Sequence, residues 1–552
     1  MKQALWLLML IIPLLIGLSC GGERIVQKET AEYVTAELQK FAPVALESDL
    51  SFLPNAEVKV LKLLVKAARI MDDIFLDQVY ADNDLILNQL KKGPADDPWL
   101  GLFKVMYGPW NRLDENHIFI GDTEKPAGAN YYPEDITAEE FHTWLEDHPE
   151  MTGPFESNFT MIRRDGEGLK AVPYAEYYKK ELKKAAEFLQ EAADLTADES
   201  LARFLRSRAA AFLSNDYYES DMDWMDLQGD IEVVIGPYEV YEDNLFGYKA
   251  AFESFICVVD HQASDDLKKI GTTLNDLERH LPIPDKHKNF NRGVSSPIKV
   301  VNEIFAAGDT KAGAQTLAFN LPNDERVREA KGSKKVMLRN VLKAKFEKIL
   351  TPIVAEVLTE ECGKQLSFDA YFKHILLHEV SHGLGPGRIT VNGRETTVNR
   401  ELKDVYSVIE EAKADVLGMY CAQYLVDTGV MDKDLEKTLY ESNLGGMFRS
   451  IRFGIEEAHG GGVAIQLNYY LDRNAVKVDE NGRFYLVKAK MKKAIRDLAR
   501  DLLMIEAEGD YKAAVAFIDK YVKVLPEVQA ALDRLNDVPV DIRPSYPIEE
   551  TM

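Results

Sequence analysis

The chain has 552 residues, is 46% hydrophobic, and carries a formal net charge of −25 with a pI near 5.0. A chain of this length can bury a large core and is expected to divide into two lobes or domains. Its acidic balance, with no basic tract, argues against a nucleic-acid partner.

The N-terminus predicts a targeting segment. After Lys2, an apolar run to Gly17 leads to Cys20, which is typical of a signal peptide with a lipoprotein-type cysteine over residues 1–20. The run is too short for a good membrane-spanning helix. We therefore expect a protein of the bacterial cell envelope, either lipid-anchored or periplasmic or secreted, that meets a membrane only through this anchor.

Residues 24 to about 215 are predicted to be predominantly helical, and no catalytic cluster stands out among them. Residues 231–241 alternate in the manner of a strand that ends at Glu239 and Tyr241. Taken alone, an acid and a tyrosine at a strand end need no special role.

The segment from His378 to His382 reads HEVSH and carries the strongest chemical signal in the chain. Histidines four residues apart on a helix can aim both imidazoles at one zinc ion. Glu379 then sits beside the metal, where its carboxylate can take a proton from the attacking water. Apolar residues recur at helical spacing before the motif, and the glycine-rich segment Gly383–Gly387 is expected to end the helix after it. The pattern favours a zinc-dependent hydrolase.

A third ligand is expected from a second helix about thirty residues downstream. Glu410, Glu411 and Asp415 lie there on an apolar-periodic segment. Of Glu411 and Asp415, one can bind the metal while the other accepts the free N–H of a ligand histidine, and Glu410 can serve the other histidine.

The two motifs together resemble the paired signature of the dipeptidyl-peptidase III family of zinc exopeptidases, whose second motif reads EExxAE or EExxAD. Three further segments agree with the family. Its NxPN loop and the segment after it resemble residues 318–324 (AFNLPND) and 336–342, and its ExY segment resembles residues 236–243. In addition, His459 stands where the family has a transition-state histidine. The resemblance covers roughly residues 220 to 470, in the family's order. One departure is the spacing: the best-known members carry HExxxH, which needs a helical bulge, whereas HEVSH fits a regular helix.

The resemblance implies a set of site residues. One zinc ion per chain would be held by His378, His382 and Glu411, with Glu410 and Asp415 as outer carboxylates and Glu379 as the general base. The remaining expected roles are oxyanion stabilisation by His459 and Tyr241, recognition of the peptide amine and backbone by Glu239, Asn320 and Asn323, and binding of a substrate carboxylate by Arg543.

The resemblance also implies an α+β, predominantly helical fold with two lobes separated by a wide cleft, one lobe helical and zinc-bearing and the other mixed with a small β-barrel. The expected boundaries are residues 24–260 plus about 311–342 for the mixed lobe, about 261–310 plus 343–540 for the helical lobe, and 541–552 for a C-terminal tail. The implied function is release of dipeptides from the N-terminus of short peptides. Another zinc aminopeptidase and a catalytically inactive peptide-binding lipoprotein remain as alternatives.

Overall fold

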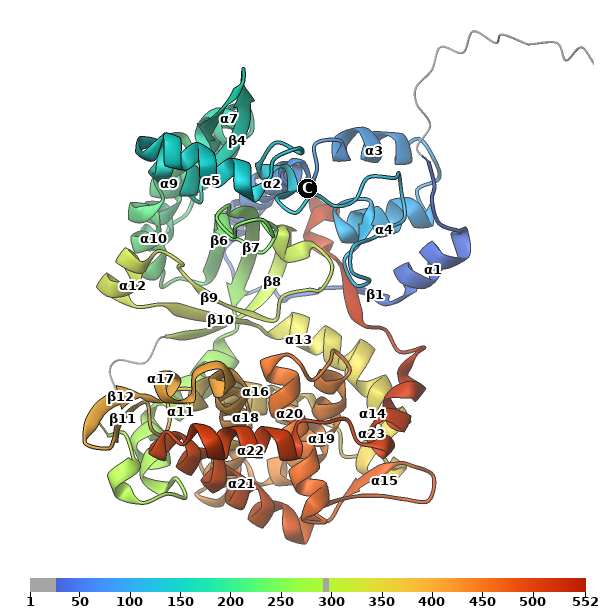
Figure 1. Cartoon of the computed structure of the whole chain (residues 1–552), viewed down its shortest axis with the longest axis vertical. Helices are drawn as coiled ribbons and strands as arrows, with labels where there is room; N and C mark the ends of the chain where they lie inside the picture. The colour runs from blue at the N-terminus through green and yellow to red at the C-terminus, as the bar shows by residue number, and fades with distance from the viewer. Residues whose placement is uncertain (1–25, 291–296) are drawn as a thin grey trace, which may run out of the picture.

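The computed structural model describes residues 26–290 and 297–552 and is predominantly helical (Figure 1). The predicted signal peptide and Cys20 lie outside the described residues. Within the described ranges, no helix has both the length and the apolar character needed to cross a bilayer.

A five-stranded mixed sheet forms the centre of the upper half of the molecule in Figure 1. Its strand order is β6-β7-β8-β10-β9, and only the β8–β10 pair is parallel. The strands are β6 (Ile231–Glu239), β7 (Ala251–Val259), β8 (Ile298–Gly308), β9 (Ala318–Leu321) and β10 (Lys334–Leu338).

Helices from the first part of the chain pack around this sheet. The long helix α2 (Asn55–Val79) contacts β7 and β8 and buries Val60, Leu64, Ala67 and Met71, which form one apolar stripe because they recur every three or four residues. The other helices of this half are α1 (Ala31–Gln39), α3 (Asn83–Leu90), α4 (Pro98–Met106), α5 (Ala138–Asp147), α6 (Thr152–Glu156), α7 (Tyr174–Tyr177), α8 (Lys179–Leu195), α9 (Glu199–Ser214), α10 (Tyr218–Met225) and α12 (Glu325–Lys331).

The lower half of the molecule in Figure 1 is built from helices. They are α11 (His261–His280), α13 (Arg339–Lys345), α14 (Thr351–Val357), α16 (Phe368–Ser381), α17 (Val398–Leu402), α18 (Tyr406–Asp427), α19 (Leu439–Ile451), α20 (Ala458–Asp472), α21 (Lys488–Glu508), α22 (Tyr511–Tyr521) and α23 (Pro526–Leu532). Strand β10 runs directly into α13, and the largest apolar core contains buried side chains of both halves, while a second, smaller core lies around α1 and α4.

Two of the expected boundaries are corrected, whereas the expected mixed, barrel-like sheet is present. Among the described residues its five strands form a half-barrel, with β6 and β9 as its edges. Residues 298–308, placed above with the helical lobe, form β8 in the middle of the sheet. Residues 541–552 are no free tail, because β15 (Asp541–Ser545) pairs in parallel with β1 (Phe41–Ala45) of the N-terminal region.

A tight hairpin connects the two helices that carry the predicted metal ligands. Strands β11 (Arg388–Val391) and β12 (Arg394–Thr397) are joined at Asn392 and Gly393, which both have positive φ. This is the turn that an Asn-Gly pair favours, and it returns the chain toward α18.

Candidate active site

Helix α16 places His378 and His382 at its C-terminal end. Ser367 caps the helix at its start by accepting a hydrogen bond from the backbone N–H of Ala370, and the helix remains a regular α-helix to Ser381. The imidazole rings of His378 and His382 lie one turn apart, with 4.9 Å between their centroids. The five-residue spacing therefore brings the two rings together without a bulge.

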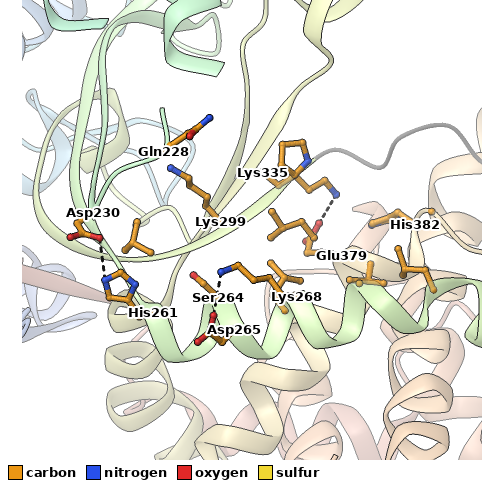
Figure 2. Close-up of a pocket in the computed structure, with 18 of the residues that line it drawn as sticks. Gln228, Asp230, His261, Ser264, Asp265, Lys268, Lys299, Lys335, Glu379 and His382 are labelled. Atoms are coloured by element: carbon orange, nitrogen blue, oxygen red, sulfur yellow. Dashed lines mark hydrogen bonds and ion pairs between the residues drawn. The ribbon is translucent and has the colours of Figure 1, made fainter. Parts of the chain in front are cut away.

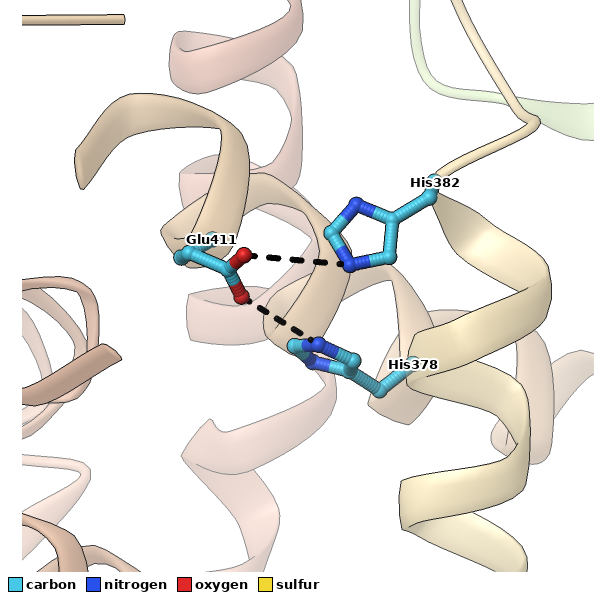
Figure 3. Close-up of side chains that lie close together, drawn as sticks. All are labelled: His378, His382 and Glu411. Carbon is cyan, nitrogen blue, oxygen red and sulfur yellow. Dashed lines mark ion pairs between the residues drawn. The ribbon is translucent and has the colours of Figure 1, made fainter. Parts of the chain in front are cut away.

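Glu411 reaches the two histidines from the neighbouring helix α18 (Figure 3). Its Oε2 lies 3.3 Å from Nε2 of His378, and its Oε1 lies 4.0 Å from Nε2 of His382. One nitrogen or oxygen atom from each of the three side chains falls within 4.8 Å of the others.

This geometry fits a zinc site. Ligand atoms about 2.1 Å from a tetrahedral zinc ion are about 3.4 Å apart, close to the observed separations. In addition, Glu411 Oε2 is buried, and its nearest partners are Nε2 of His378 and Nε2 of His459, each 3.3 Å away. A cation between Glu411 and the two histidines would bind this oxygen more closely.

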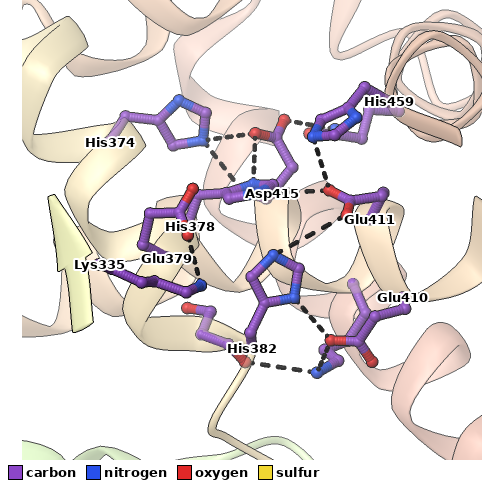
Figure 4. Close-up of polar contacts among 12 residues, drawn as sticks. Lys335, His374, His378, Glu379, His382, Glu410, Glu411, Asp415 and His459 are labelled. Atoms are coloured by element: carbon purple, nitrogen blue, oxygen red, sulfur yellow. Dashed lines mark hydrogen bonds and ion pairs between the residues drawn. The ribbon is translucent and has the colours of Figure 1, made fainter. Parts of the chain in front are cut away.

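Each ligand histidine has its own carboxylate partner (Figure 4). Nδ1 of His378 lies 3.2 Å from Oδ1 of Asp415, and Nδ1 of His382 lies 2.8 Å from Oε1 of Glu410. These contacts leave Nε2 of each ring toward Glu411, so they select the ring orientation that a metal needs. Of the two arrangements left open by the sequence, the structure places Glu411 between the rings and Asp415 behind His378.

Both outer carboxylates are fixed in turn by buried donors to which the sequence analysis assigned no role. Gln466 of α20 donates from Nε2 to Oδ2 of Asp415 at 2.6 Å, and Lys413 donates from Nζ to Oε1 of Glu410 at 2.8 Å. Burial raises the pKa of Glu410, but Lys413 and then His382 outweigh it and lower that pKa to about 2. Lys413 was visible inside the second motif, and Gln466 lies two helical turns after His459, which is the signal that could have identified it.

Glu379 is engaged by a lysine from the sheet. Its Oε2 accepts a hydrogen bond from Nζ of Lys335 at 2.6 Å, and the two side chains are 22% and 25% exposed. Burial raises the pKa of Glu379, but the charges of Lys335 and then His378 outweigh it and hold that pKa below its usual value. The predicted metal ligands His378, His382 and Glu411 are called the metal group below. A carboxylate kept ionised beside this group is competent to accept a proton.

Glu379 lines two cavities. The first, of about 630 Å³, extends from Glu379 and His382 along α11 to the starts of β6 and β8 and includes Lys335 (Figure 2). The second, of about 520 Å³, is lined by Glu379, His378, Glu411 and His459 and by Ala318 of β9. Both have the volume of small-molecule sites and combine side chains of the sheet with side chains of the helices.

His459 joins the metal group from the start of α20. Its Nε2 lies 3.3 Å from Oε2 of Glu411, and its side chain is 69% exposed toward the second cavity. The glycines that follow it allow close helix packing: a Cβ built on Gly462 would lie 2.8 Å from the backbone nitrogen of Ala412 in α18. The glycines thus hold His459 and Glu411 together through the α18–α20 contact.

The predicted amine-binding residues gather at the sheet. Asn323 donates to the carbonyl oxygen of Tyr238 at 3.0 Å and lies 3.4 Å from Oε1 of Glu239. Burial raises the pKa of Glu239, and this acid in turn raises the pKa of Tyr241, whose side chain is 77% exposed. Asn320 lies on the edge strand β9, directly opposite Lys335. Of these four residues, none lines the two cavities beside Glu379.

Arg543 lies elsewhere. It lines a separate cavity of about 530 Å³ between α2, α4 and β15, which shares no residue with the two cavities beside Glu379. The expected role for Arg543 as an anchor of a substrate carboxylate stays a prediction. Its position follows from the pairing of β15 with β1, which no local pattern in the sequence announces.

Comparison with known proteins identifies relatives along nearly the whole chain. Residues 162–423 match peptidase family M49. The solved structure of DPP III from Caldithrix abyssi is 52% identical, with a TM-score of 0.89, over 93% of this chain and 99% of that one. The dipeptidyl-peptidase III structure from Corallococcus sp. strain EGB is 45% identical, with a TM-score of 0.75, over 94% of this chain and 98% of that one.

Two curated relatives have different names. Nudix hydrolase 3 of Arabidopsis thaliana is 39% identical over 94% of this chain, which spans 74% of that protein. Dipeptidyl peptidase 3 of Dictyostelium discoideum is 23% identical over 64% of this chain, which spans 58% of that protein. The high identity to two bacterial structures along their full length, together with the family match over the metal group, decides the assignment: the chain belongs to peptidase family M49, the dipeptidyl-peptidase III family.

Proposed function

We propose that this protein is a zinc-dependent exopeptidase that hydrolyses short peptides and releases dipeptides from their N-terminus. The observation that carries the proposal is the convergence of His378, His382 and Glu411 beside Glu379, an ionised carboxylate that opens on two cavities. Zinc at this site would supply Lewis-acid activation of the scissile carbonyl and of the attacking water.

The side chains support a division of labour in the reaction. Glu379 takes a proton from the water whose oxygen attacks the scissile carbonyl carbon, and it delivers that proton to the leaving nitrogen as the C–N bond breaks. The products are a dipeptide with a new carboxylate and a shortened peptide with a new amine. His459, which lines the cavity beside Glu411, is placed to donate a hydrogen bond to the developing oxyanion, and Tyr241 is the further candidate for this role.

Selection of the N-terminus falls to the acidic end of β6. Glu239 is the acid for the peptide amine, and Asn323 contacts its carboxylate at 3.4 Å. Asn320, on β9 at the other edge of the sheet, is the proposed contact for the peptide backbone. A fixed distance between Glu239 and the metal group would set the cut after the second residue.

We also propose that the sheet-bearing half and the helical half act as two lobes around a cleft that closes on peptide. Supporting this, each cavity beside Glu379 is lined from both halves, with Lys335 and Ala318 on the sheet side. Closure would exclude water from the reaction. Small-angle scattering of a Glu379→Ala variant with and without an octapeptide should show a smaller radius of gyration when peptide is bound.

The test of the function is mass spectrometry of an octapeptide digested by the zinc-loaded protein. Stepwise loss of two residues from the N-terminus is expected, and it should disappear in Glu379→Ala with zinc content unchanged. Glu361→Ala, at an exposed acid outside the site, is the matched control and should cleave normally. An N-acetylated octapeptide should resist cleavage, since it offers no amine to Glu239.

The other outcomes identify the alternatives. Loss of single residues would indicate an aminopeptidase. A peptide that binds but stays intact would indicate a binding protein, and equal cleavage of free and acetylated peptides would remove Glu239 from its proposed role.

A further inference from the structure

Among the described residues, Lys335 is the only side chain that donates a hydrogen bond to Glu379. Its Nζ donates to Oε2 of Glu379 at 2.6 Å, and Figures 2 and 4 show this contact at the wall of the larger cavity. Lys335 comes from β10 and Glu379 from α16, so the contact joins the sheet to the helix of the metal group. No motif in the sequence assigns a role to this lysine.

The contact controls the orientation of the carboxylate. A glutamate side chain has three rotatable bonds, and Glu379 would sample several rotamers without a partner. Because Lys335 engages Oε2, the carboxylate plane is fixed while Oε1, which accepts no hydrogen bond from the described residues, is left for the water proton. General-base catalysis needs the oxygen within hydrogen-bond reach of the water, and a misplacement of about 1 Å can cost about 100-fold in rate.

Strand β10, which carries Lys335, also pairs with β9, which carries the proposed peptide-binding residue Asn320. Lys335 on β10 stands directly opposite Asn320 on β9 in the antiparallel register. The backbone hydrogen bonds between β9 and β10 therefore fix the separation between Lys335, which holds the base, and Asn320, which is proposed to hold the peptide.

We propose that Lys335 is a positioning residue: it holds the Glu379 carboxylate in the orientation from which the base meets the attacking water. The inference rests on the proposed peptidase function and adds to it a residue that acts through Glu379 on the chemical step. Substrate binding itself does not depend on the lysine.

The simpler interpretation is a structural ion pair that ties two elements together. The protein contains a matched pair for separating the two, because Lys311 Nζ lies 3.2 Å from Oδ2 of Asp72 with side chains 26% and 23% exposed. This pair has nearly the same exposure as Lys335 and Glu379 but lies away from the metal group. A purely structural role would make the Lys335→Met and Lys311→Met variants behave alike.

The experiment compares Lys335→Met, Lys335→Arg and Lys311→Met with the native chain, each zinc-loaded, in steady-state kinetics on a dipeptidyl naphthylamide, with zinc content and urea unfolding measured in parallel. Lys335→Met is expected to lower kcat about 10- to 100-fold with little change in KM or zinc content. Lys335→Arg, which keeps a cationic donor, should recover part of the loss. Lys311→Met should keep the native kcat.

Several results would overturn the inference: an unchanged kcat in Lys335→Met, a raised kcat, which would make the contact inhibitory, or a change confined to KM. An equal loss of kcat in Lys311→Met would also overturn it, by showing a general effect on the fold. These failures differ from failure of the proposed function, in which the native chain itself would release no dipeptides.

Discussion

Replacement of Gln466 by methionine tests whether the buried network behind the metal group sets zinc affinity. Gln466 is fully buried, and its Nε2 donates to Oδ2 of Asp415, whose other oxygen holds the ring of His378. Methionine has a similar length and no branch, so it fills the same space without the donor. Asp415 then keeps its contact with His378 but loses the bond that fixes its carboxylate plane.

Two effects on stability nearly cancel in this variant. A hydrogen bond to a charged group contributes about 1.5–3 kcal/mol, which Gln466→Met removes. However, Oε1 of Gln466 is buried without a hydrogen-bond partner among the described residues, and removing such a group recovers about 1–3 kcal/mol. We therefore expect a free energy of unfolding close to that of the native chain.

Zinc affinity should change far more than stability. Loss of a partner behind a ligand histidine lowers metal affinity about 10- to 100-fold, which is about 1.4–2.7 kcal/mol. The assay is competition for zinc between the metal-free chain and a chromophoric chelator. Gln423→Met is the matched control, because Gln423 is a buried glutamine that donates to Asp427 at 2.8 Å and contacts no predicted metal ligand. A zinc affinity of Gln466→Met within about twofold of native, or an equal loss in the control, would refute the reasoning.

Two further outcomes are expected. Burial alone lowers the pKa of His378, but hydrogen bonds with Asp415 and Glu411 outweigh it and raise that pKa to about 10 before zinc binds. Zinc binding near pH 7 should then release about one proton from His378, and zinc affinity should rise with pH toward 10. Calorimetry in buffers of different ionisation enthalpy measures the proton release. A binding enthalpy that is independent of the buffer would contradict this prediction. Since the folded pKa lies above the usual histidine value of 6.5, the metal-free chain should also lose the stabilisation from protonated His378 as pH rises from 6.5 to about 10. Gly462→Ala should lower the free energy of unfolding in urea by about 1–3 kcal/mol and weaken zinc binding, because the new Cβ meets the backbone of α18. Gly271→Ala is the control: Gly271 has open space around it in α11, so this change should raise the free energy of unfolding by about 0.5–1 kcal/mol.

The sequence predicted those parts of the site that lie on single helices. The spacing of His378 and His382 depends only on helical geometry, and Asp415 follows Glu411 by one turn. Such features follow from the chain within a few residues, so the pattern alone was sufficient.

Features that depend on contacts between distant segments were missed or misplaced. Lys335 meets Glu379 across 44 positions, and Gln466 meets Asp415 across 51. Residues 541–545 were assigned to a tail because their pairing with β1 joins segments far apart in the sequence. Periodicity describes which face of an element is buried, but the partner on that face is set by tertiary packing.

The position of the metal group at the end of α16 has a physical consequence of its own. The C-terminal end of a helix carries a partial negative charge on its free carbonyl groups, which favours a cation such as zinc near His382. The same carbonyl groups need donors, and the buried ammonium of Lys413 lies 3.3 Å from the carbonyl oxygens of both Ser381 and Leu384 while it also holds Glu410. A single lysine thus binds carbonyl groups at the helix end and orients the carboxylate behind His382. The five-residue spacing fits this arrangement because His378 lies in the last turn of α16 and His382 is its C-cap residue, so both rings lie at the helix end.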